Sequence, residues 1–473
     1  MRGQKPVMLT AALLTGICES SGVAAAGNDW GAAKPGSDGA GDSYYPQDGN
    51  GGYDVADYNL KVTYDPASHQ LTGVQDIAAR ATQSLSSFNL DLRGLTVQSV
   101  TVDGAVAKFT RKGDELSVTP ARGLVKGGTF STEVRYSGIP EGYTDPVLGS
   151  LGFLATDDGA IAQGEPEVAA SWFPVNDHPR DKATYEIALT VPDGLAALSN
   201  GTLKGKSRVT GGLTKWQWQE TSPMASYLAM VMIGEYRVTE GKHGSLPVVT
   251  AVHKSLPTSV DKVMARTPEL LDFLVTQFGP YPFEATGGIV HNDPRFGFAL
   301  ENQSRPVYSP GFFSSTESAI GVQIHELAHQ WYGDSVSVDS WRDIWLNEGF
   351  ATYAEWLWSE KSGGETAQQT FDGLYASRGA RSGWRVKPGD PGKKDLFSSA
   401  VYQQGGMTLH ALRITIGDQK FFPLLKQWAA KKQDGNATTA EFVALAQQVS
   451  GENLQGFFDA WLFKGTKPPY PKR

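Results

Sequence analysis

His325-Glu326-Leu327-Ala328-His329 is the stretch of this 473-residue chain around which the remaining sequence is best interpreted. The run predicts a helix, and residues four apart on a helix leave the same face about one turn apart. Two imidazoles at that spacing reach one metal ion. Glu326 is displaced in angle from both histidines, so it faces a water on the metal and not the metal itself. The stretch therefore predicts a metal site with a carboxylate poised beside it.

A third ligand is expected within Trp345-Leu346-Asn347-Glu348-Gly349-Phe350, where Glu348 follows His329 with 18 residues between them. Two histidines and one carboxylate leave a fourth position for water, which is the composition of a catalytic zinc site. We predict one Zn²⁺ per chain, held by His325, His329 and Glu348, although cobalt or manganese would substitute in vitro. The alternative, an ordinary buried helix, would leave two histidines and a glutamate without partners on an apolar face.

Two helices are predicted to carry these ligands. Ser314 and Glu317 resemble a capping box, so the first helix should run over residues 317–332. The second should span residues 341–361, with Asp339 or Ser340 as its N-cap and the glycines at 363 and 364 as its stop.

Glu355 is a candidate for orienting one of the ligands. It lies seven residues beyond Glu348 and therefore shares its helix face. We expect its carboxylate to accept a hydrogen bond from the second ring N–H of a ligand histidine, His329. The alternative is a solvated glutamate on the outer face of the helix.

Length and composition indicate a globular chain of two or three domains, with 40% hydrophobic and 11% aromatic residues. The net charge of −8 argues against a nucleic-acid partner, which would favour a basic face. Apolar and polar residues alternate between residues 53 and 242, as around Tyr58 and Tyr185, and this pattern indicates strands with one buried face. Residues 243–473 are mainly helical in pattern. The predicted fold class is therefore multidomain α and β, with a β domain before a helical catalytic domain.

The N-terminus has the features of a secretory signal. Arg2 and Lys5 precede an apolar run over residues 7–18, which is too short to span a bilayer, and alanines at 24–26 fit a cleavage site after Ala26. We therefore expect a secreted protein without stable membrane insertion. Cys18 is the only cysteine, so the mature chain would have no disulfide and no thiol ligand. Residues 27–52 are rich in Gly, Asp and Ser and are expected to form a flexible lead-in.

H-E-L-A-H, followed after 18 residues by N-E-G-F-A, resembles the gluzincin metallopeptidases of the M1 family, which include aminopeptidase N and leukotriene A4 hydrolase. The resemblance implies a saddle-like antiparallel β domain over residues 53–242 and a thermolysin-like catalytic domain over residues 243–473. Many members continue into a C-terminal helical domain. Because this chain stops soon after Trp461-Leu462-Phe463, it resembles a secreted bacterial type that lacks that domain.

The same resemblance identifies substrate-binding candidates. Phe298-Ala299-Leu300-Glu301-Asn302 stands where the family has Gly-x-Met-Glu-Asn, so Glu301 and Asn302 match while two other positions differ. It implies that Glu301 binds the free α-amine of the substrate. Gln163-Gly164-Glu165 resembles the family's Gln-x-Glu/Gln motif, so Gln163 and Glu165 are expected near the amine pocket. Tyr402, in Tyr402-Gln403-Gln404-Gly405, matches a Tyr-x-x-Gly motif and would stabilise the transition state.

The implied function is that of a zinc aminopeptidase acting on peptides with a free N-terminus, with Glu326 as general base toward a metal-activated water. Two alternatives stay open on the sequence. One is an exported zinc endopeptidase with an open cleft, and the other is an inactive peptide-binding protein on the same scaffold. The sequence does not define the oligomeric state.

Overall fold

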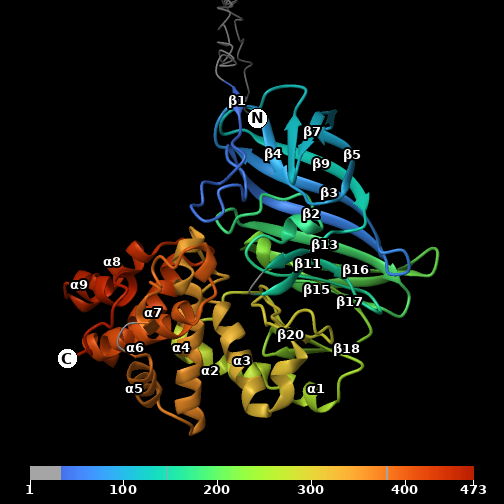
Figure 1. Cartoon of the computed structure of the whole chain (residues 1–473). Helices are drawn as coiled ribbons and strands as arrows, with labels where there is room; N and C mark the ends of the chain where they lie inside the picture. Colours follow the sequence, from blue (N-terminus) through green and yellow to red (C-terminus); the bar gives the residue numbers. More distant parts are fainter. Residues whose placement is uncertain (1–32, 146–147, 380–381, 473) are drawn as a thin grey trace, which may run out of the picture.

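The computed structural model describes residues 33–145, 148–379 and 382–472. Figure 1 shows a β-rich part at the top and right and most helices gathered at the lower left. The predicted signal segment, residues 1–26, and the first part of the lead-in lie outside the described residues, so export stays a prediction. Within the described ranges, no helix combines the length and the apolar character needed to cross a lipid bilayer.

An eight-stranded sheet forms the body of the β domain. Across the sheet its strands are β15 (Thr202–Val209), β16 (Leu213–Met224), β13 (Ala183–Pro192), β2 (Tyr53–Asp65), β3 (Gln70–Ala81), β9 (Thr129–Gly138), β5 (Thr96–Val102) and β6 (Ala105–Val106). Neighbouring strands are antiparallel except β13 and β2, which pair in parallel. The predicted alternation is confirmed, because Tyr58, Leu60 and Val62 on β2 are buried between more exposed neighbours.

Two smaller sheets complete the β domain. A five-stranded sheet has the order β10 (Tyr143–Asp145), β11 (Gly149–Ala155), β12 (Ala160–Gln163), β17 (Val231–Gly234) and β14 (Ala196–Leu198). A four-stranded sheet has the order β1 (Lys34–Pro35), β4 (Leu85–Asp91), β8 (Glu115–Thr119) and β7 (Lys108–Lys112). All four residues of β12 are buried, and the chain leaves this strand directly into Gly164 and Glu165.

The second part of the chain combines a four-stranded sheet with most of the helices. The sheet has the order β18 (Tyr236–His243), β19 (Leu246–His253), β20 (Thr286–Val290) and β21 (Val307–Tyr308). The helices are α1 (Ser259–Met264), α2 (Thr267–Phe278), α3 (Thr316–His329), α4 (Trp345–Ser362), α5 (Ala367–Ser377), α6 (Gly405–Ile416), α7 (Asp418–Lys432), α8 (Thr439–Ser450) and α9 (Gln455–Phe458), with a small sheet of β22 (Val336–Val338) and β23 (Gly435–Ala437). The predicted fold class is confirmed. The expected boundary at 242/243 falls inside the β18–β19 hairpin, which belongs to this second part.

The two predicted ligand helices form, with shifted starts. Ser315, not Ser314, caps α3, since its hydroxyl oxygen accepts a hydrogen bond from the Ser318 N–H at 3.1 Å while residue 314 ends a 3₁₀ turn. A 3₁₀ turn, η5 (Trp341–Asp343), precedes α4, so the α-helix starts at Trp345 and not at residue 341. Gly363 ends α4 in the left-handed conformation with φ of 87°, as the predicted stop requires.

The expected flexible lead-in is wrong for residues 33–52, which pack against the rest of the protein. Tyr45 is 6% exposed and Asp42 2% exposed, and β1 pairs with β4. Asn50 donates from Nδ2 to Asp91 Oδ2 at 3.1 Å. The composition misled the prediction because turns fixed by polar side chains, and not aliphatic residues, hold this segment.

Arg305 fastens the two parts of the molecule together. Its side chain is fully buried and donates from Nη2 to the Gly201 carbonyl oxygen at 2.9 Å and from Nη1 to the Ser199 carbonyl oxygen. The guanidinium carbon also lies 4.7 Å from the centre of the Trp218 ring. Both carbonyls belong to the turn between β14 and β15 of the β domain. The guanidinium of Arg305, which belongs to the catalytic domain, therefore satisfies two buried acceptors of the β domain.

We expect Arg305→Met to lower the free energy of unfolding by about 3 kcal/mol. Methionine keeps most of the length of the side chain, but two buried carbonyl oxygens lose their hydrogen-bond donors. Chemical denaturation followed by tryptophan fluorescence measures the change. Arg135→Met is the matched control. Its ion pair with Glu133 has side chains 53% and 33% exposed, and its loss should cost less than about 0.5 kcal/mol. Equal losses in the two variants would contradict the role given to Arg305.

Candidate active site and metal centre

The structure brings the three predicted metal ligands together where α3 and α4 cross. His325 Nε2 lies 3.1 Å from Glu348 Oε2, and His329 Nε2 lies 3.4 Å from the same oxygen. One ligand atom from each residue lies within 4.8 Å of the others. The two imidazole rings have centres 4.8 Å apart, as the spacing of four residues predicts.

The hydrogen bonds behind the histidines fit a metal in front of them. His325 Nδ1 lies 2.6 Å from Glu355 Oε1, and His329 Nδ1 lies 3.0 Å from the Tyr332 carbonyl oxygen. Acceptors at both Nδ1 atoms favour the tautomer that leaves each Nε2 with a free lone pair toward Glu348. Two nitrogens, one carboxylate oxygen and an open fourth side are the donor set of zinc.

Glu355 supports a ligand histidine, but the predicted partner is wrong. It contacts His325, whereas His329 is held by a backbone carbonyl. The helices α3 and α4 run in opposite directions. His325, the earlier histidine on α3, contacts Glu355, the later glutamate on α4, whereas His329 contacts Glu348. The relative direction of two helices cannot be predicted from sequence spacing alone.

Charge in the site favours a bound cation. Burial alone would lower the pKa of His329, but the carboxylates of Glu301 and Glu348 raise that pKa to about 9. Burial would also raise the pKa of Glu348, yet the neighbouring His329 and His325 hold this pKa below its ordinary value. No lysine or arginine is among the described residues that line the surrounding cavity. The point where the three ligand atoms meet therefore attracts positive charge.

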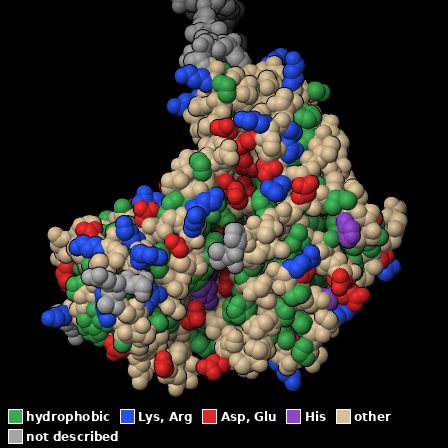
Figure 2. Space-filling model, viewed as in Figure 1, with side chains coloured by type: hydrophobic (Ala, Val, Ile, Leu, Met, Phe, Trp, Pro, Cys, Tyr) green, Lys and Arg blue, Asp and Glu red, His purple; other side chains and the backbone are tan. Residues whose placement is uncertain are grey.

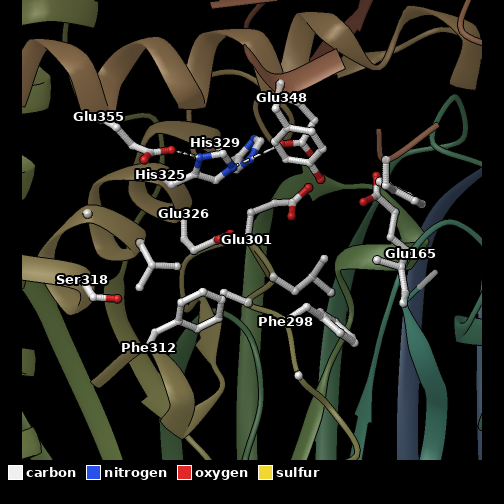
Figure 3. A pocket seen from close by; sticks show the side chains of 18 residues that line it. Glu165, Phe298, Glu301, Phe312, Ser318, His325, Glu326, His329, Glu348 and Glu355 are labelled. Atoms are coloured by element: carbon white, nitrogen blue, oxygen red, sulfur yellow. Dashed lines mark hydrogen bonds and ion pairs between the residues drawn. The ribbon is translucent and has the colours of Figure 1, made fainter. Parts of the chain in front are cut away.

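A cavity of about 520 Å³ opens beside the metal ligands. Figure 2 shows a hollow on this face, between the β-rich and helical parts, with acidic and histidine side chains near it. Apolar side chains line the cavity together with Glu165, Glu301 and Glu326, and Figure 3 shows that Glu165 enters from the β domain, opposite α3 and α4. The apolar lining comprises Leu148, Phe298, Ala299, Leu300, Phe312, Val322 and Phe397. The site is thus shared by the two domains.

Hydrogen bonds hold both the carboxylate and the backbone carbonyl of Glu301. The Tyr227 hydroxyl donates to Glu301 Oε1 at 3.0 Å, and Gln330 Nε2 donates to the Glu301 carbonyl oxygen at 2.8 Å. Gln330 Oε1 in turn accepts from the Ser304 N–H at 2.7 Å. The sequence prediction missed both residues. Gln330 directly follows the second histidine and could have been considered, whereas Tyr227 lies 74 positions before Glu301 and carries no motif.

The other predicted substrate-binding residues have different surroundings. Glu165 lines the cavity, and its buried Oε1 has no protein partner in the described part of the chain. Burial, reinforced by the charge of Glu301, raises the pKa of Glu165 well above its ordinary value. Asn302 donates to the Leu228 carbonyl oxygen at 2.9 Å, and Gln163 is buried at the end of β12. Neither Asn302 nor Gln163 is among the described lining residues.

Tyr402 reaches the site from a π-helical turn, Ala400–Gln404, just before α6. Its ring stacks on His325 with centres 5.9 Å apart and an interplanar angle of 18°. This approach requires Gly349 on α4, because an added Cβ there would lie 2.9 Å from the Gly405 Cα. Burial and the charge of Glu348 raise the pKa of Tyr402 well above its ordinary value, so its hydroxyl stays protonated as a donor.

Two family models match the chain, the Peptidase M1 N-terminal domain over residues 55–228 and the Peptidase family M1 domain over residues 264–461. Aminopeptidase N of Lactococcus lactis subsp. lactis is 26% identical over 447 residues, which are 88% of this chain and 51% of that protein. Aminopeptidase M1-D of Oryza sativa subsp. japonica is 27% identical over 339 residues, which are 66% of this chain and 38% of that protein. The chain spans about half the length, or less, of these curated relatives.

Solved structures resemble the chain over nearly its full described length. The crystal structure of an M1 zinc metallopeptidase from Deinococcus radiodurans aligns with a TM-score of 0.82 and 27% identity, over 92% of this chain and 99% of that chain. A mutant of the M1 zinc metallopeptidase from that organism, bound to a Tyr-Ser-Ala substrate, also aligns with a TM-score of 0.82.

The β domain, the helical domain and the His-His-Glu group on α3 and α4 define a two-domain zinc metallopeptidase. The chain belongs to the M1 family of peptidases. The family and the ligand geometry bear out the prediction of one catalytic Zn²⁺.

We expect Glu355→Ala to weaken zinc binding by about 10–100-fold, because His325 loses the acceptor that orients its ring. Competition with a chromogenic chelator measures the affinity. Glu317→Ala, an exposed position in the first turn of α3, is the matched control and should leave zinc affinity unchanged. Unaltered zinc affinity in Glu355→Ala would show that the contact with His325 is not needed to hold the metal.

Proposed function

We propose that this chain is a zinc aminopeptidase that hydrolyses the N-terminal peptide bond of peptides. One observation supports this proposal above the others. Glu301 and Glu165 line the same cavity as the metal ligands, and no described lysine or arginine there neutralises them. Carboxylates without a protein cation suit the α-ammonium of a substrate, which would fix the position of its first peptide bond. The aminopeptidase names of the curated relatives are consistent with this.

His325, His329 and Glu348 would hold zinc, which when bound supplies Lewis acidity that polarises a carbonyl and lowers the pKa of a water toward about 7. Glu326 would take a proton from the attacking water and deliver it to the leaving amine. It is 5% exposed and lines the cavity, and burial raises its pKa above the ordinary range, so proton transfer near neutral pH is favoured.

Tyr402 and the amine-binding carboxylates would complete the reaction site. The protonated Tyr402 hydroxyl would donate to the oxyanion that develops on the scissile carbonyl. Glu301, held by Tyr227, would receive the α-ammonium close to the metal ligands, since one of its carboxylate oxygens lies within 4.8 Å of side-chain atoms of Glu326 and His329. Binding of the ammonium beside the metal ligands would place the first peptide bond of the substrate at the metal.

A panel of aminoacyl-anilides, each with a free and an N-acetylated amine, tests this function. We expect cleavage of the free-amine forms, loss of cleavage after chelation and recovery with zinc. An endopeptidase with an open cleft would cleave the acetylated and free forms equally, or would cleave internal bonds of longer peptides. Binding of peptides without cleavage by the zinc-loaded chain would indicate a peptide-binding protein.

We expect Glu326→Gln to keep its zinc and lose about 10²–10⁴-fold in kcat, because the amide cannot accept the water proton. Metal analysis and steady-state kinetics on the same sample measure both quantities. Glu317→Gln on the same helix is the control and should keep full activity. Loss of zinc together with activity would contradict the role of Glu326 as a base.

A further inference from the structure

Residues 33–52, here called the N-terminal strap, precede both segments that match the family models. We infer that the strap positions the amine-binding end of the active site, acting on Glu301 through Trp341 and Tyr227. This inference rests on the proposed aminopeptidase function, because it concerns the carboxylate that would bind the substrate amine.

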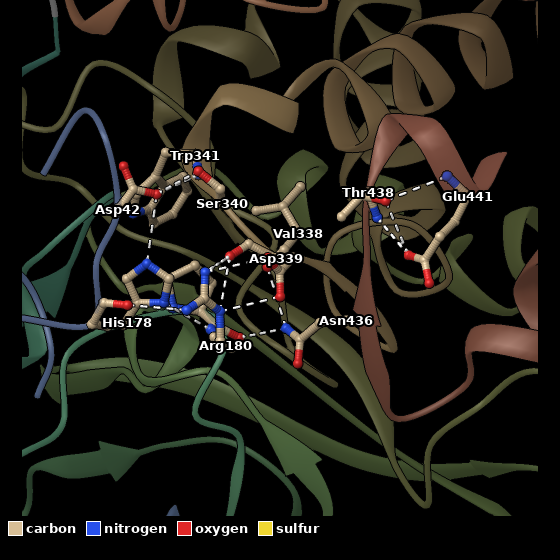
Figure 4. Close-up of polar contacts among 12 residues, drawn as sticks. Asp42, His178, Arg180, Val338, Asp339, Ser340, Trp341, Asn436, Thr438 and Glu441 are labelled. Atoms are coloured by element: carbon tan, nitrogen blue, oxygen red, sulfur yellow. Dashed lines mark hydrogen bonds and ion pairs between the residues drawn. The ribbon is translucent and has the colours of Figure 1, made fainter. Parts of the chain in front are cut away.

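Asp42 fixes the backbone of the turn that leads into α4. Its Oδ2 accepts hydrogen bonds from the Ser340 hydroxyl at 2.8 Å and from the Trp341 N–H at 2.9 Å (Figure 4). Its Oδ1 accepts from the Tyr44 N–H at 2.7 Å, which holds the strap against the same carboxylate. His178 Nε2 lies 3.6 Å from Asp42 Oδ2, and both of these side chains are fully buried. The carboxylate therefore ties the strap to the start of η5 and holds the backbone of Trp341.

Arg180 of the β domain secures the strap and the catalytic domain at once. Its Nη1 donates to the Ala40 carbonyl oxygen at 3.0 Å, while Nε and Nη2 donate to the two carboxylate oxygens of Asp339 at 3.1 and 3.2 Å. Figure 4 shows Arg180 and Asp339 below Ser340, and His178 below Asp42. Two residues beyond Asp42, the Tyr44 hydroxyl ties the strap to the catalytic domain by donating to Asp390 Oδ1 at 2.5 Å. The strap is thus held by side chains from both domains.

A row of aromatic rings connects the strap to the amine-binding carboxylate. Tyr45 meets the edge of Trp341 with ring centres 6.4 Å apart. Trp341 meets Tyr227 at 5.3 Å, and the Tyr227 hydroxyl donates to Glu301 Oε1 at 3.0 Å. All three rings are buried, with exposures of 6%, 0% and 1% along the row. In a close-packed interior, a shift of one ring displaces the next.

Trp341 is the member of this row that depends most on the strap. Its buried Nε1 has no hydrogen-bond partner among the described residues, so no side-chain hydrogen bond fixes the indole. Asp42 holds its backbone and Tyr45 packs on its ring. Removing either strap contact would let the indole move away from Tyr227, and the hydroxyl that orients Glu301 would move with it.

The test compares two inhibitors that differ only in the amine. L-leucine hydroxamate and 4-methylpentanohydroxamate share the zinc-binding group and the side chain, so the ratio of their inhibition constants isolates the interaction of the ammonium with the protein. Zinc content and thermal stability are measured on every full-length variant. The ratio is the inhibition constant of 4-methylpentanohydroxamate divided by that of L-leucine hydroxamate, so it is large when the protein binds the ammonium. Tyr227→Phe removes the donor to Glu301 and should lower this ratio about tenfold or more, which sets the scale.

We expect Tyr45→Ala and Asp42→Ala each to lower this ratio by about threefold to tenfold, mainly by weakening the amine-bearing inhibitor. Tyr45→Phe keeps the ring and should retain the wild-type ratio. If Tyr45→Ala or Asp42→Ala does not fold, Tyr45→Leu and Asp42→Asn, which keep most of the side-chain volume, are measured in their place and decide the result in the same way.

Two results would overturn the inference. An unchanged ratio in folded strap variants would show that the strap only adds stability. An equal loss for both inhibitors would show that it acts through Glu348 and the metal. Equal binding of the two inhibitors by the wild-type protein would instead contradict the proposed aminopeptidase function, because Glu301 would then not bind the amine.

Discussion

The concentration of carboxylates around one buried point is the constraint on which the rest of the structure depends. Glu301, Glu326 and Glu348 lie at a cavity that no described lysine or arginine lines, and Glu165 faces them from the β domain. Buried negative charges repel one another and are costly unless cations compensate them. The two histidines attract one cation, the metal, and the remaining carboxylates suit the ammonium of a substrate. The same electrostatic excess therefore explains the metal centre and the proposed choice of substrate.

The scaffold around this point prevents the carboxylates from moving apart. The antiparallel helices α3 and α4 supply the metal ligands. The contact between Gly349 and Gly405 brings the Tyr402 turn against α4. Glu165 lies two residues beyond the end of β12, so the five-stranded sheet sets its position. Arg305 fastens the two domains, which keeps the carboxylate of one domain facing the metal ligands of the other. Stability of the domain interface and geometry of the site are thus linked.

The local part of this arrangement could be predicted from the sequence, since helical spacing alone places His325 and His329 on one face. Features that depend on how elements cross could not. The partner of Glu355 was assigned to the wrong histidine because the relative direction of α3 and α4 does not follow from spacing. Tyr227 was missed because its contact with Glu301 joins two domains. Residues 33–52 were expected to be flexible because their composition lacks aliphatic residues, whereas buried polar contacts such as those of Asp42 hold them in place.

The central claim is that one set of buried carboxylates places both the metal and the substrate amine. A crystal structure of the zinc-loaded Glu326→Gln variant with a bound tripeptide, recorded with anomalous scattering at the zinc edge, tests it most directly. The account predicts one anomalous peak between His325, His329 and Glu348, and a peptide whose α-amine lies within hydrogen-bonding distance of Glu301. A peptide that runs past Glu301 with residues on both sides, or a metal bound elsewhere in the cavity, would contradict it.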